Sequence, residues 1–562
     1  MAWIDWIVLG FYFAGVLSLG AWLARRQKST DDYFLGGKRM SGGLVGISLA
    51  ANQVSAVSLV SAPAFVALGP DGGLRWLQYE LAVPLAMVGI LLLLGPLYPR
   101  LRSASVYEYA ERRFGVSVRT SLSGIFLLSR GLATGITLYT TALVLSVSMG
   151  FPILPVYLLL GLFAVAYTTL GGIQADVYSD VIQFVVLWVG VVVAMGVAVG
   201  MIADLPGSIG LLDPGRTLTL DMRHHGWGDG RAFSFWPMLL GGLFLYMSYY
   251  GCDQSQAQRL IANGSLPAVR RSLLVNGMIR FPVVLTYCLF GLLLALLLAQ
   301  DASFAARMDG ERPDTLVPVF LSSYLPAGLR GLVISGIFAA AMSSIDSALN
   351  SLSAITVEDF LSRASRWADV TTRRRLRLRL SRLVTLFWGA VCLGSGWLFA
   401  ASPRTIIELV NMVGSAFYGP VLAVFACGLL ARRVQARGVL LGLVGGVAAN
   451  LVLWQAAPRV SWLWWNPAGF LVTACLALGW SLLEPGTGKT DAHGLPEASA
   501  QPAAAVSTRG RDDLLASLGE SLRQSRFAVL LLAAFFCLIL AVTAWLGALL
   551  APAGAAARVV LQ

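Results

Sequence analysis

Small hydroxyl and carboxylate side chains recur along one apolar segment of this chain, 331–350 (GLVISGIFAAAMSSIDSALN). Its consecutive turns carry the polar residues Ser343, Ser344, Asp346, Ser347 and Asn350. Polar groups are costly in hydrocarbon, and those that occur there usually face a pathway or a bound ion. Hydroxyl and carboxylate oxygens can bind a hard cation. The alternative is that the serines only join neighbouring helices by hydrogen bonds.

A second apolar segment, 43–68, is interrupted near its middle by four polar residues: Asn52, Gln53, Ser55 and Ser58. This pattern predicts a broken helix, which at membrane depth is tolerated where it lines a cavity or is buried in protein. Transporters bind ions and substrates at such breaks, because unwound carbonyls and helix ends are free to coordinate them. A kinked helix with a purely structural role is the alternative.

Two further apolar segments carry charged residues. Asp180 lies deep in one of them and is expected to be buried, whereas Asp176 lies near its cytoplasmic end and is expected to be solvated. Arg130 lies well inside the other, where a lone guanidinium needs an anionic partner. The candidates for that partner are Asp180, Asp346, Glu80 and an anionic substrate held by two hydrogen bonds.

These residues need a membrane-spanning scaffold to position them. The chain has 562 residues, of which 57% are hydrophobic and 12% are charged, whereas soluble proteins carry about 25% charged residues. A membrane helix needs about 20 apolar residues. The sequence supplies fourteen such segments, at 3–24, 43–68, 76–98, 120–147, 154–171, 178–201, 234–252, 273–299, 329–355, 383–401, 406–430, 439–457, 462–483 and 527–551.

Positive charge is distributed unevenly between alternate connections. If the N-terminus is outside, the cytoplasmic connections hold 29 of the 41 Lys and Arg residues, and the outside segments hold 9. This asymmetry follows the positive-inside rule and predicts that both termini lie outside. The net charge of +12 is therefore read as a topology signal, and no nucleic-acid partner is expected. The basic run 373–382 is expected to lie near anionic lipid.

Residues 484–526 are rich in Pro, Gly, Ala and Ser. This composition predicts a disordered cytoplasmic linker. No part of the chain has the pattern of a soluble catalytic domain, so we expect neither enzymatic activity nor catalytic residues.

Several motifs follow one another in a fixed order. They are DYFLGGKRMSG (32–42), NQVSAVS at the broken helix, a GGxxAxxxxDxxQ pattern (171–183), DQ and QR within 253–259, AAAMSSIDSALNSLS, and GSAFYGP (414–420), which is expected to break its helix. With these motifs the chain resembles the sodium:solute symporter family over about residues 5–440. The motifs are specific to the family and do not indicate a substrate.

The resemblance implies an all-α polytopic membrane protein with about fourteen transmembrane helices and a LeuT-like core. That core would consist of two inverted five-helix repeats, 43–201 and 234–431. The other parts would be the first helix with its cytoplasmic loop (1–42), an extracellular loop (202–233), two additional helices (432–483), the linker (484–526), and a last helix with a tail (527–562).

The resemblance also implies the ion and its ligands. A sodium ion would lie between the broken helix and the segment 329–355. Its ligands would be the backbone carbonyls of Ala51, Val54 and Ala340 and the hydroxyls of Ser343 and Ser344. A second sodium site of some family members falls on Asp180, Ser343, Asp346 and Ser347. A coupled proton would need a carboxylate that titrates, whereas the paired serines favour Na+, because a hydroxyl does not bind a proton near neutral pH.

The implied substrate pocket is lined by Gln53, Ser55, Ser58, Gln78, Arg130, Tyr246, Tyr249 and Tyr250. Relatives that carry sialate and related carboxylates place an arginine in the segment that holds Arg130, which favours an organic anion (monocarboxylate or sialate-like). We therefore expect a symporter of the plasma (bacterial inner) membrane that couples inward sodium flux to solute uptake, with the monomer as the functional unit. The alternatives are a proton-coupled, sugar or amino-acid symporter of the same fold, and a transporter-like sensor or channel.

Overall fold

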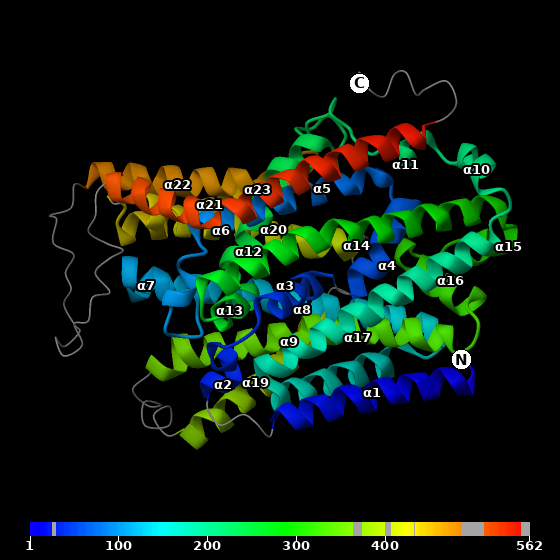
Figure 1. Ribbon diagram of the computed structural model, residues 1–562, viewed down its shortest axis with the longest axis horizontal. Coiled ribbons are helices and arrows are strands. Elements are labelled where there is room, and N and C mark those ends of the chain that lie inside the picture. The colour runs from blue at the N-terminus through cyan, green and yellow to red at the C-terminus, as the bar shows by residue number, and fades with distance from the viewer. Residues whose placement is uncertain are drawn as a thin grey trace.

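The protein is a bundle of helices that run roughly side by side (Figure 1). The computed structural model describes residues 1–24, 30–54, 56–363, 374–398, 406–431, 433–484 and 511–551. These ranges contain helices and turns but no β-strand. The all-α prediction is therefore confirmed.

The first part of the bundle extends to residue 201. Its elements are α1 (Trp3–Ala24), α2 (Thr30–Leu35), α3 (Gly42–Gln53), α4 (Ala56–Leu68), α5 (Leu77–Glu80), α6 (Ala82–Leu93), α7 (Glu108–Phe114), α8 (Val116–Met149) and α9 (Ile153–Met201). Helix α9 is kinked at Gly172, whose φ of 58° is in the range that glycine adopts without steric cost. This kink separates the two apolar segments that the sequence predicts there.

The second part follows two short connecting helices, α10 (Leu205–Ser208) and α11 (Pro214–Thr217). It contains a π-helical turn (Pro237–Gly241), α12 (Gly242–Cys252), α13 (Gln254–Ala262), α14 (Leu266–Gln300), α15 (Ala302–Met308), α16 (Leu316–Tyr324), α17 (Leu329–Ile355), α19 (Arg374–Leu398) and α20 (Ile406–Leu430). The chain continues with α21 (Ala436–Ala456), α22 (Trp465–Leu483) and α23 (Arg511–Leu549).

The predicted break in the second apolar segment is confirmed. Helix α3 ends at Gln53, and the pair α3 and α4 is bent by 51°. Val54, which follows α3, has a ψ of 77° that no longer fits an α-helix. The polar residues of the motif therefore lie where backbone groups leave the helical hydrogen-bond pattern.

The predicted break at the GSAFYGP motif is wrong, because α20 runs through Pro420 without interruption. A proline inside a helix leaves the carbonyl four residues earlier without its usual donor. That carbonyl belongs to Ala416, and the side-chain amide of Asn450 on α21 donates to it at 3.0 Å. A neighbouring helix thus replaces the missing hydrogen bond.

Each of the fourteen predicted segments overlaps a helix. Within the described residues, ten helices are individually long and apolar enough to cross a membrane, and the bent pair α3–α4 makes eleven. The protein is therefore a multi-pass helical membrane protein. The number of fourteen spans and the two inverted repeats stay predictions.

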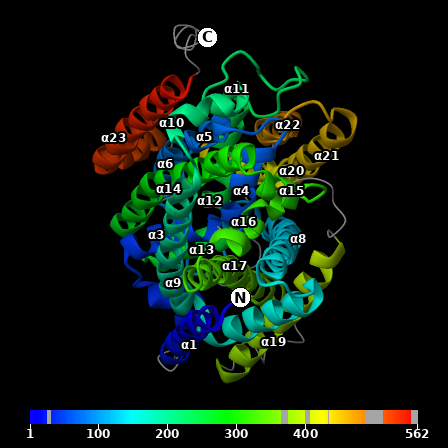
Figure 2. The ribbon, with the colours of Figure 1, turned by 90° about the vertical axis from the view of Figure 1, so that its right-hand side faces the viewer.

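Helix α17, which carries the serine-rich motif, lies inside the bundle. It packs along α9 and also contacts α8, α1, α19 and α3. In two perpendicular views, α1 and α23 lie at opposite edges of the bundle, with α17 between them (Figures 1 and 2). The polar residues of α17 are therefore enclosed by protein, as a functional role within the membrane requires.

The start of α1 and the loops 202–233 and 301–328 lie at one end of the bundle, whereas α2 and α7 lie toward the other (Figure 1). The Asp5 carboxylate accepts hydrogen bonds from the backbone N–H groups of Gly328 (2.7 Å) and Gly331 (2.9 Å). The Thr219 hydroxyl donates to the carbonyl of Thr543 near the end of α23. This arrangement agrees with a topology in which α1 begins and α23 ends on the same side.

A labelling experiment tests which side of the membrane each end of the bundle faces. We expect Glu311→Cys to react with a membrane-impermeant thiol reagent in intact cells, and Ser117→Cys to react after the membrane is permeabilised. Both positions are exposed and lie at opposite ends of the bundle. The end that holds Ser117 carries most of the positive charge, which the positive-inside rule assigns to the cytoplasm. Both variants are made in a cysteine-free background, and labelling of Ser117→Cys in intact cells would contradict the topology.

Candidate functional site

An internal cavity of about 120 Å³ lies where the broken helix meets α5, α8, α12, α14, α17 and α20. Among the predicted substrate-binding residues, those that line it are Gln53, Ser58, Arg130, Tyr246 and Tyr249. Tyr250 is not among these lining residues, but its hydroxyl donates a hydrogen bond to the side-chain oxygen of Gln53, which is one of them. Ser55 lies outside the described residues.

Gln78 does not line the cavity, contrary to the prediction. Its side-chain oxygen accepts a hydrogen bond from the backbone N–H of Asp221 (2.8 Å), and its amide nitrogen donates to the carbonyl of Arg75 (3.1 Å). Gln78 therefore attaches the 202–233 loop to the start of α5. The sequence places it at the correct depth, but its side chain points toward the loop.

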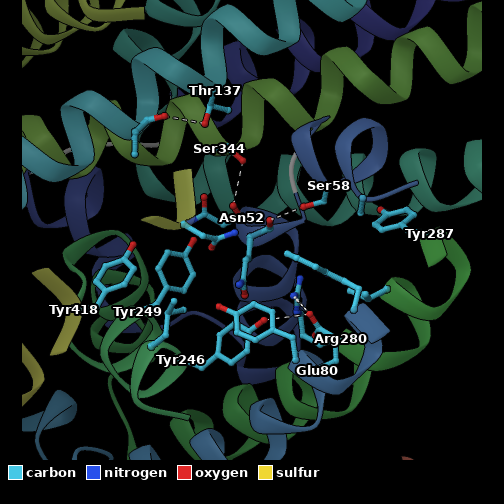
Figure 3. A pocket seen from close by; sticks show the side chains of 18 of the residues that line it. Asn52, Ser58, Glu80, Thr137, Tyr246, Tyr249, Arg280, Tyr287, Ser344 and Tyr418 are labelled. Carbon is cyan, nitrogen blue, oxygen red and sulfur yellow. Dashed lines mark hydrogen bonds and ion pairs between the residues drawn. The ribbon is translucent and has the colours of Figure 1, made fainter. Parts of the chain in front are cut away.

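A buried ion pair that the sequence analysis did not anticipate also lines the cavity. Arg280 on α14 donates to Glu80 on α5 at 2.8 Å, and the Tyr246 hydroxyl donates to the same oxygen of Glu80 at 3.2 Å (Figure 3). The sequence signal for this pair is one acidic and one basic residue, each in an otherwise apolar segment. Glu80 was considered only as a partner for Arg130, and Arg280 was given no role.

Arg130 has no carboxylate within ion-pair distance in the described part of the chain. Its guanidinium carbon lies 6.0 Å from the centre of the Tyr249 ring, which gives a cation–π contact, and the guanidinium also interacts with the Tyr249 hydroxyl. Its Nε has no hydrogen-bond partner among the described residues. Of its predicted partners, Glu80 binds Arg280, and Asp180 binds Arg259. Asp346 accepts a hydrogen bond from Thr168 at 2.6 Å. None of these three carboxylates therefore pairs with Arg130. A carboxylate that the sequence analysis did not consider, Asp253 at the end of α12, attracts the guanidinium electrostatically without forming an ion pair. Direct contact with an anion is thus left to a substrate.

A second polar cluster lies between α9, α13, α3 and α17, and it is centred on Arg259. One guanidinium nitrogen of Arg259 lies 2.8 Å from Asp176 and 2.9 Å from Asp180, and its Nε donates to Ser48 at 2.8 Å. The expectation that Asp176 is solvated is wrong, because Asp176 is only 4% exposed. Arg259 from α13 supplies the partner that allows Asp176 to be buried.

The residues of the predicted second sodium site fall into two hydrogen-bonded groups in this structure. Ser343 donates to Asp180, and Ser347 donates to Asp176 at 2.9 Å, so both belong to the Arg259 cluster. Asp346 instead contacts Thr168 on α9, and its other carboxylate oxygen has no hydrogen-bond partner. The structure thus joins Asp180, Ser343 and Ser347 through an arginine and keeps the Asp346 carboxylate outside that hydrogen-bonded cluster.

The residues of the predicted first sodium site come from the broken helix and from α17, which contact each other. The Ser344 hydroxyl donates to the carbonyl of Asn52 at 3.1 Å, directly at the break. Ala51, Val54 and Ala340 are all buried. A hydroxyl on α17 is therefore in contact with the backbone carbonyls that the break makes available.

Comparison with known proteins decides the family. The model of the sodium:solute symporter family matches residues 33–446. The chain belongs to this family. It is therefore a sodium-coupled solute transporter, and sodium is the coupled ion.

Some relatives of this symporter are named for organic anions, and others for iodide or for vitamins. The chain is 29% identical over 477 residues to the sodium/sialic acid symporter NanT of Aliivibrio fischeri, covering 84% of this chain and 91% of the relative. It is 29% identical over 455 residues to the human sodium-coupled monocarboxylate transporter 1, covering 78% of this chain and 72% of the relative. A solved structure of a substrate-bound, outward-open Na+-coupled sialic acid symporter superposes with a TM-score of 0.77 at 25% identity, covering 86% of this chain and 98% of the other.

We expect the Arg259 cluster to be essential for the stability of this symporter. Arg259→Gln leaves Asp176 and Asp180 buried without a cation, and breaking a buried ion pair costs about 3–5 kcal/mol. The measurement is the melting temperature of the purified protein in detergent, with the exposed loop substitution Arg223→Gln as the control. A melting temperature of Arg259→Gln equal to that of the control would show that the cluster contributes little.

Proposed function

We propose that this symporter carries a small organic anion into the cell across the plasma (bacterial inner) membrane. The observation that carries this proposal is Arg130, a guanidinium that lines the cavity and makes no direct ion pair with a carboxylate of the described residues, with Asp253 acting on it from a longer distance. A charge in such a place is costly unless an anion accompanies it. A guanidinium also binds a carboxylate through two parallel hydrogen bonds.

The alternatives fit the cavity less well. A neutral sugar would leave Arg130 without an anion in direct contact, with only the longer-range attraction of Asp253. A zwitterionic amino acid would satisfy Arg130 but would also bring an ammonium group. Among the described lining residues, the one carboxylate is that of Glu80, which is already paired with Arg280. The relatives named for sialic acid and for monocarboxylates support an anion.

The proposed sodium site uses the carbonyls of Ala51, Val54 and Ala340 together with the hydroxyls of Ser343 and Ser344. Support for it comes from the contact between Ser344 and the Asn52 carbonyl at the helix break. Rotation of the Ser344 O–H bond can turn an oxygen lone pair toward an ion at the same place. Oxygen ligands of this kind replace the water molecules that a cation loses on binding.

We propose one sodium site rather than two. A second ion beside Asp180 would compete with the Arg259 guanidinium for the same carboxylate. Its remaining proposed ligand, Asp346, accepts a hydrogen bond from Thr168 instead. In this proposal, Asp180, Ser343 and Ser347 hold α9, α13 and α17 together, and the Ser343 hydroxyl changes partner when sodium binds at the first site.

Removal of the Ser344 hydroxyl tests the sodium site. Ser344→Ala is expected to raise the sodium concentration for half-maximal uptake about ten- to a hundredfold, since one ligand to a charge is worth about 1.5–3 kcal/mol. The matched control is Ser335→Ala on the same helix, because the Ser335 hydroxyl donates only to the carbonyl of Gly331 in its own helix. Equal sodium dependence in the two variants would argue against this site.

Substitution of Arg130 tests the anion site. Arg130→Lys should weaken substrate binding about ten- to a hundredfold, because an ammonium group cannot make the planar two-pronged contact with a carboxylate. The sodium dependence should stay at the wild-type value, since Arg130 is not a proposed sodium ligand. Substrate affinity and sodium affinity are measured in proteoliposomes, with Arg223→Lys in the outer loop as the control. Undiminished substrate affinity in Arg130→Lys would refute the proposal.

A further inference from the structure

The Glu80–Arg280 ion pair is buried, yet it forms part of the wall of the substrate cavity. Glu80 is 1% exposed and Arg280 is 4% exposed. The pair comes from two different helices, α5 and α14, and lies beyond Tyr246 as seen from Tyr249 and Tyr418 (Figure 3). Arg130 contacts Tyr249, so the cavity has one positively charged group near that tyrosine and a neutral ion pair in another part of its wall.

The pair is incompletely satisfied. Only one carboxylate oxygen of Glu80 accepts the hydrogen bonds from Arg280 and Tyr246. The other oxygen, Oε2, has no partner in the described part of the chain, and neither has Nε of Arg280. Both polar atoms of the neighbouring Asn52 side chain, which also lines the cavity, are likewise without a partner there.

A purely structural ion pair would be expected to satisfy its buried atoms, because most buried polar groups in proteins have a hydrogen-bond partner. Here the unpaired oxygen and the unpaired amide are found together at one cavity. An unpaired buried acceptor costs free energy, and a ligand with hydrogen-bond donors would remove that cost. This part of the cavity therefore suits hydroxyl groups of a substrate.

The charges around the cavity limit the charge of that substrate. The described lining residues include two cations, Arg130 and Arg280, and one anion, Glu80. Because Glu80 neutralises Arg280, one positive charge remains for the substrate. A second carboxylate on the substrate would approach the Glu80 carboxylate, and an ammonium group would approach the Arg280 guanidinium. Neutral donors meet neither repulsion.

We propose that Glu80 selects hydroxylated monocarboxylates: it masks the charge of Arg280, so that Arg130 alone binds an anionic group. Its free oxygen, which is enclosed in this structure, accepts a hydrogen bond from a substrate hydroxyl when the carboxylate turns toward the cavity. This inference rests on the proposed function and deepens it. It makes Glu80 a specificity-determining residue. Removal of the Glu80 charge would convert the Arg280 end of the cavity into a second anion site.

The test compares two series of matched carboxylates. One series consists of gluconate, hexanoate and glucarate, which differ in hydroxyl groups or in a second carboxylate. The other consists of lactate, propionate and hydroxymalonate. Sodium-dependent uptake, or competition for it, is measured in proteoliposomes for the wild type, for Glu80→Gln and for the double variant Glu80→Met/Arg280→Met. The double variant keeps the net charge of the cavity and removes the hydrogen-bonding groups of both side chains.

For whichever series the wild type transports, we expect the hydroxylated monocarboxylate to bind at least tenfold more tightly than the other two members. In Glu80→Gln the exposed Arg280 charge should improve the affinity for the dicarboxylate relative to the monocarboxylate at least tenfold. The double variant should return this ratio to the wild-type value but reduce the preference for hydroxylated over plain monocarboxylates, because it lacks the carboxylate acceptor.

A wild-type protein that transports the dicarboxylate or the plain carboxylate as well as the hydroxylated one would overturn the inference. So would a ratio of dicarboxylate to monocarboxylate affinity that is the same in all three proteins. If the Glu80→Gln protein does not accumulate in the membrane, the comparison of the wild type with the double variant tests the inference. An unchanged preference for hydroxylated monocarboxylates in the double variant would also overturn the inference. Failure to transport any carboxylate would instead overturn the proposed function, and this inference with it.

Discussion

The cost of burying charge inside a membrane bundle is the constraint on which the rest of this structure depends. A single guanidinium, that of Arg259, offsets this cost by pairing with two carboxylates, Asp176 and Asp180. Because the same side chain also contacts Ser48 on α3 and Ser347 on α17, it joins four helices at one point. Buried charges are costly unless they are paired and hydrogen-bonded, and these contacts of Arg259 fix the position of α17 relative to the broken helix.

That position brings the proposed ion site and the cavity together. The break after α3 presents the Asn52 carbonyl to Ser344 and the side chains of Asn52 and Gln53 to the cavity. In the proposed mechanism, a sodium ion that binds at the break therefore orders an element that also touches the substrate. Binding of one then favours binding of the other, as reciprocal coupling between two sites requires. The two unlike arginines of the cavity, one paired and one without a carboxylate, set which substrates can use this coupling.

The sequence is sufficient for the helical fold and for the broken helix, because these depend on apolar length and on local polar interruptions. Five residues of the cavity wall follow from the family resemblance. The sequence is insufficient where a partner comes from a distant element. The position of Asp176 near one end of its apolar segment predicts that it is solvated. The sequence does not predict that Arg259 on α13 packs against it and forms an ion pair. The helix through Pro420 persists because Asn450 on another helix supplies the missing donor. Gln78 lies at the right depth, but the loop at Asp221 determines its direction.

The central claim is that an inward sodium gradient drives the uptake of an organic anion through this cavity. The most direct measurement is uptake of a labelled hydroxylated monocarboxylate into proteoliposomes that contain the purified protein, under either a sodium gradient or a proton gradient of equal size. The account predicts accumulation above the external concentration with the sodium gradient, and only equilibration when potassium replaces sodium. Accumulation driven by the proton gradient in sodium-free buffer, or uptake that is equal with and without sodium, would contradict it.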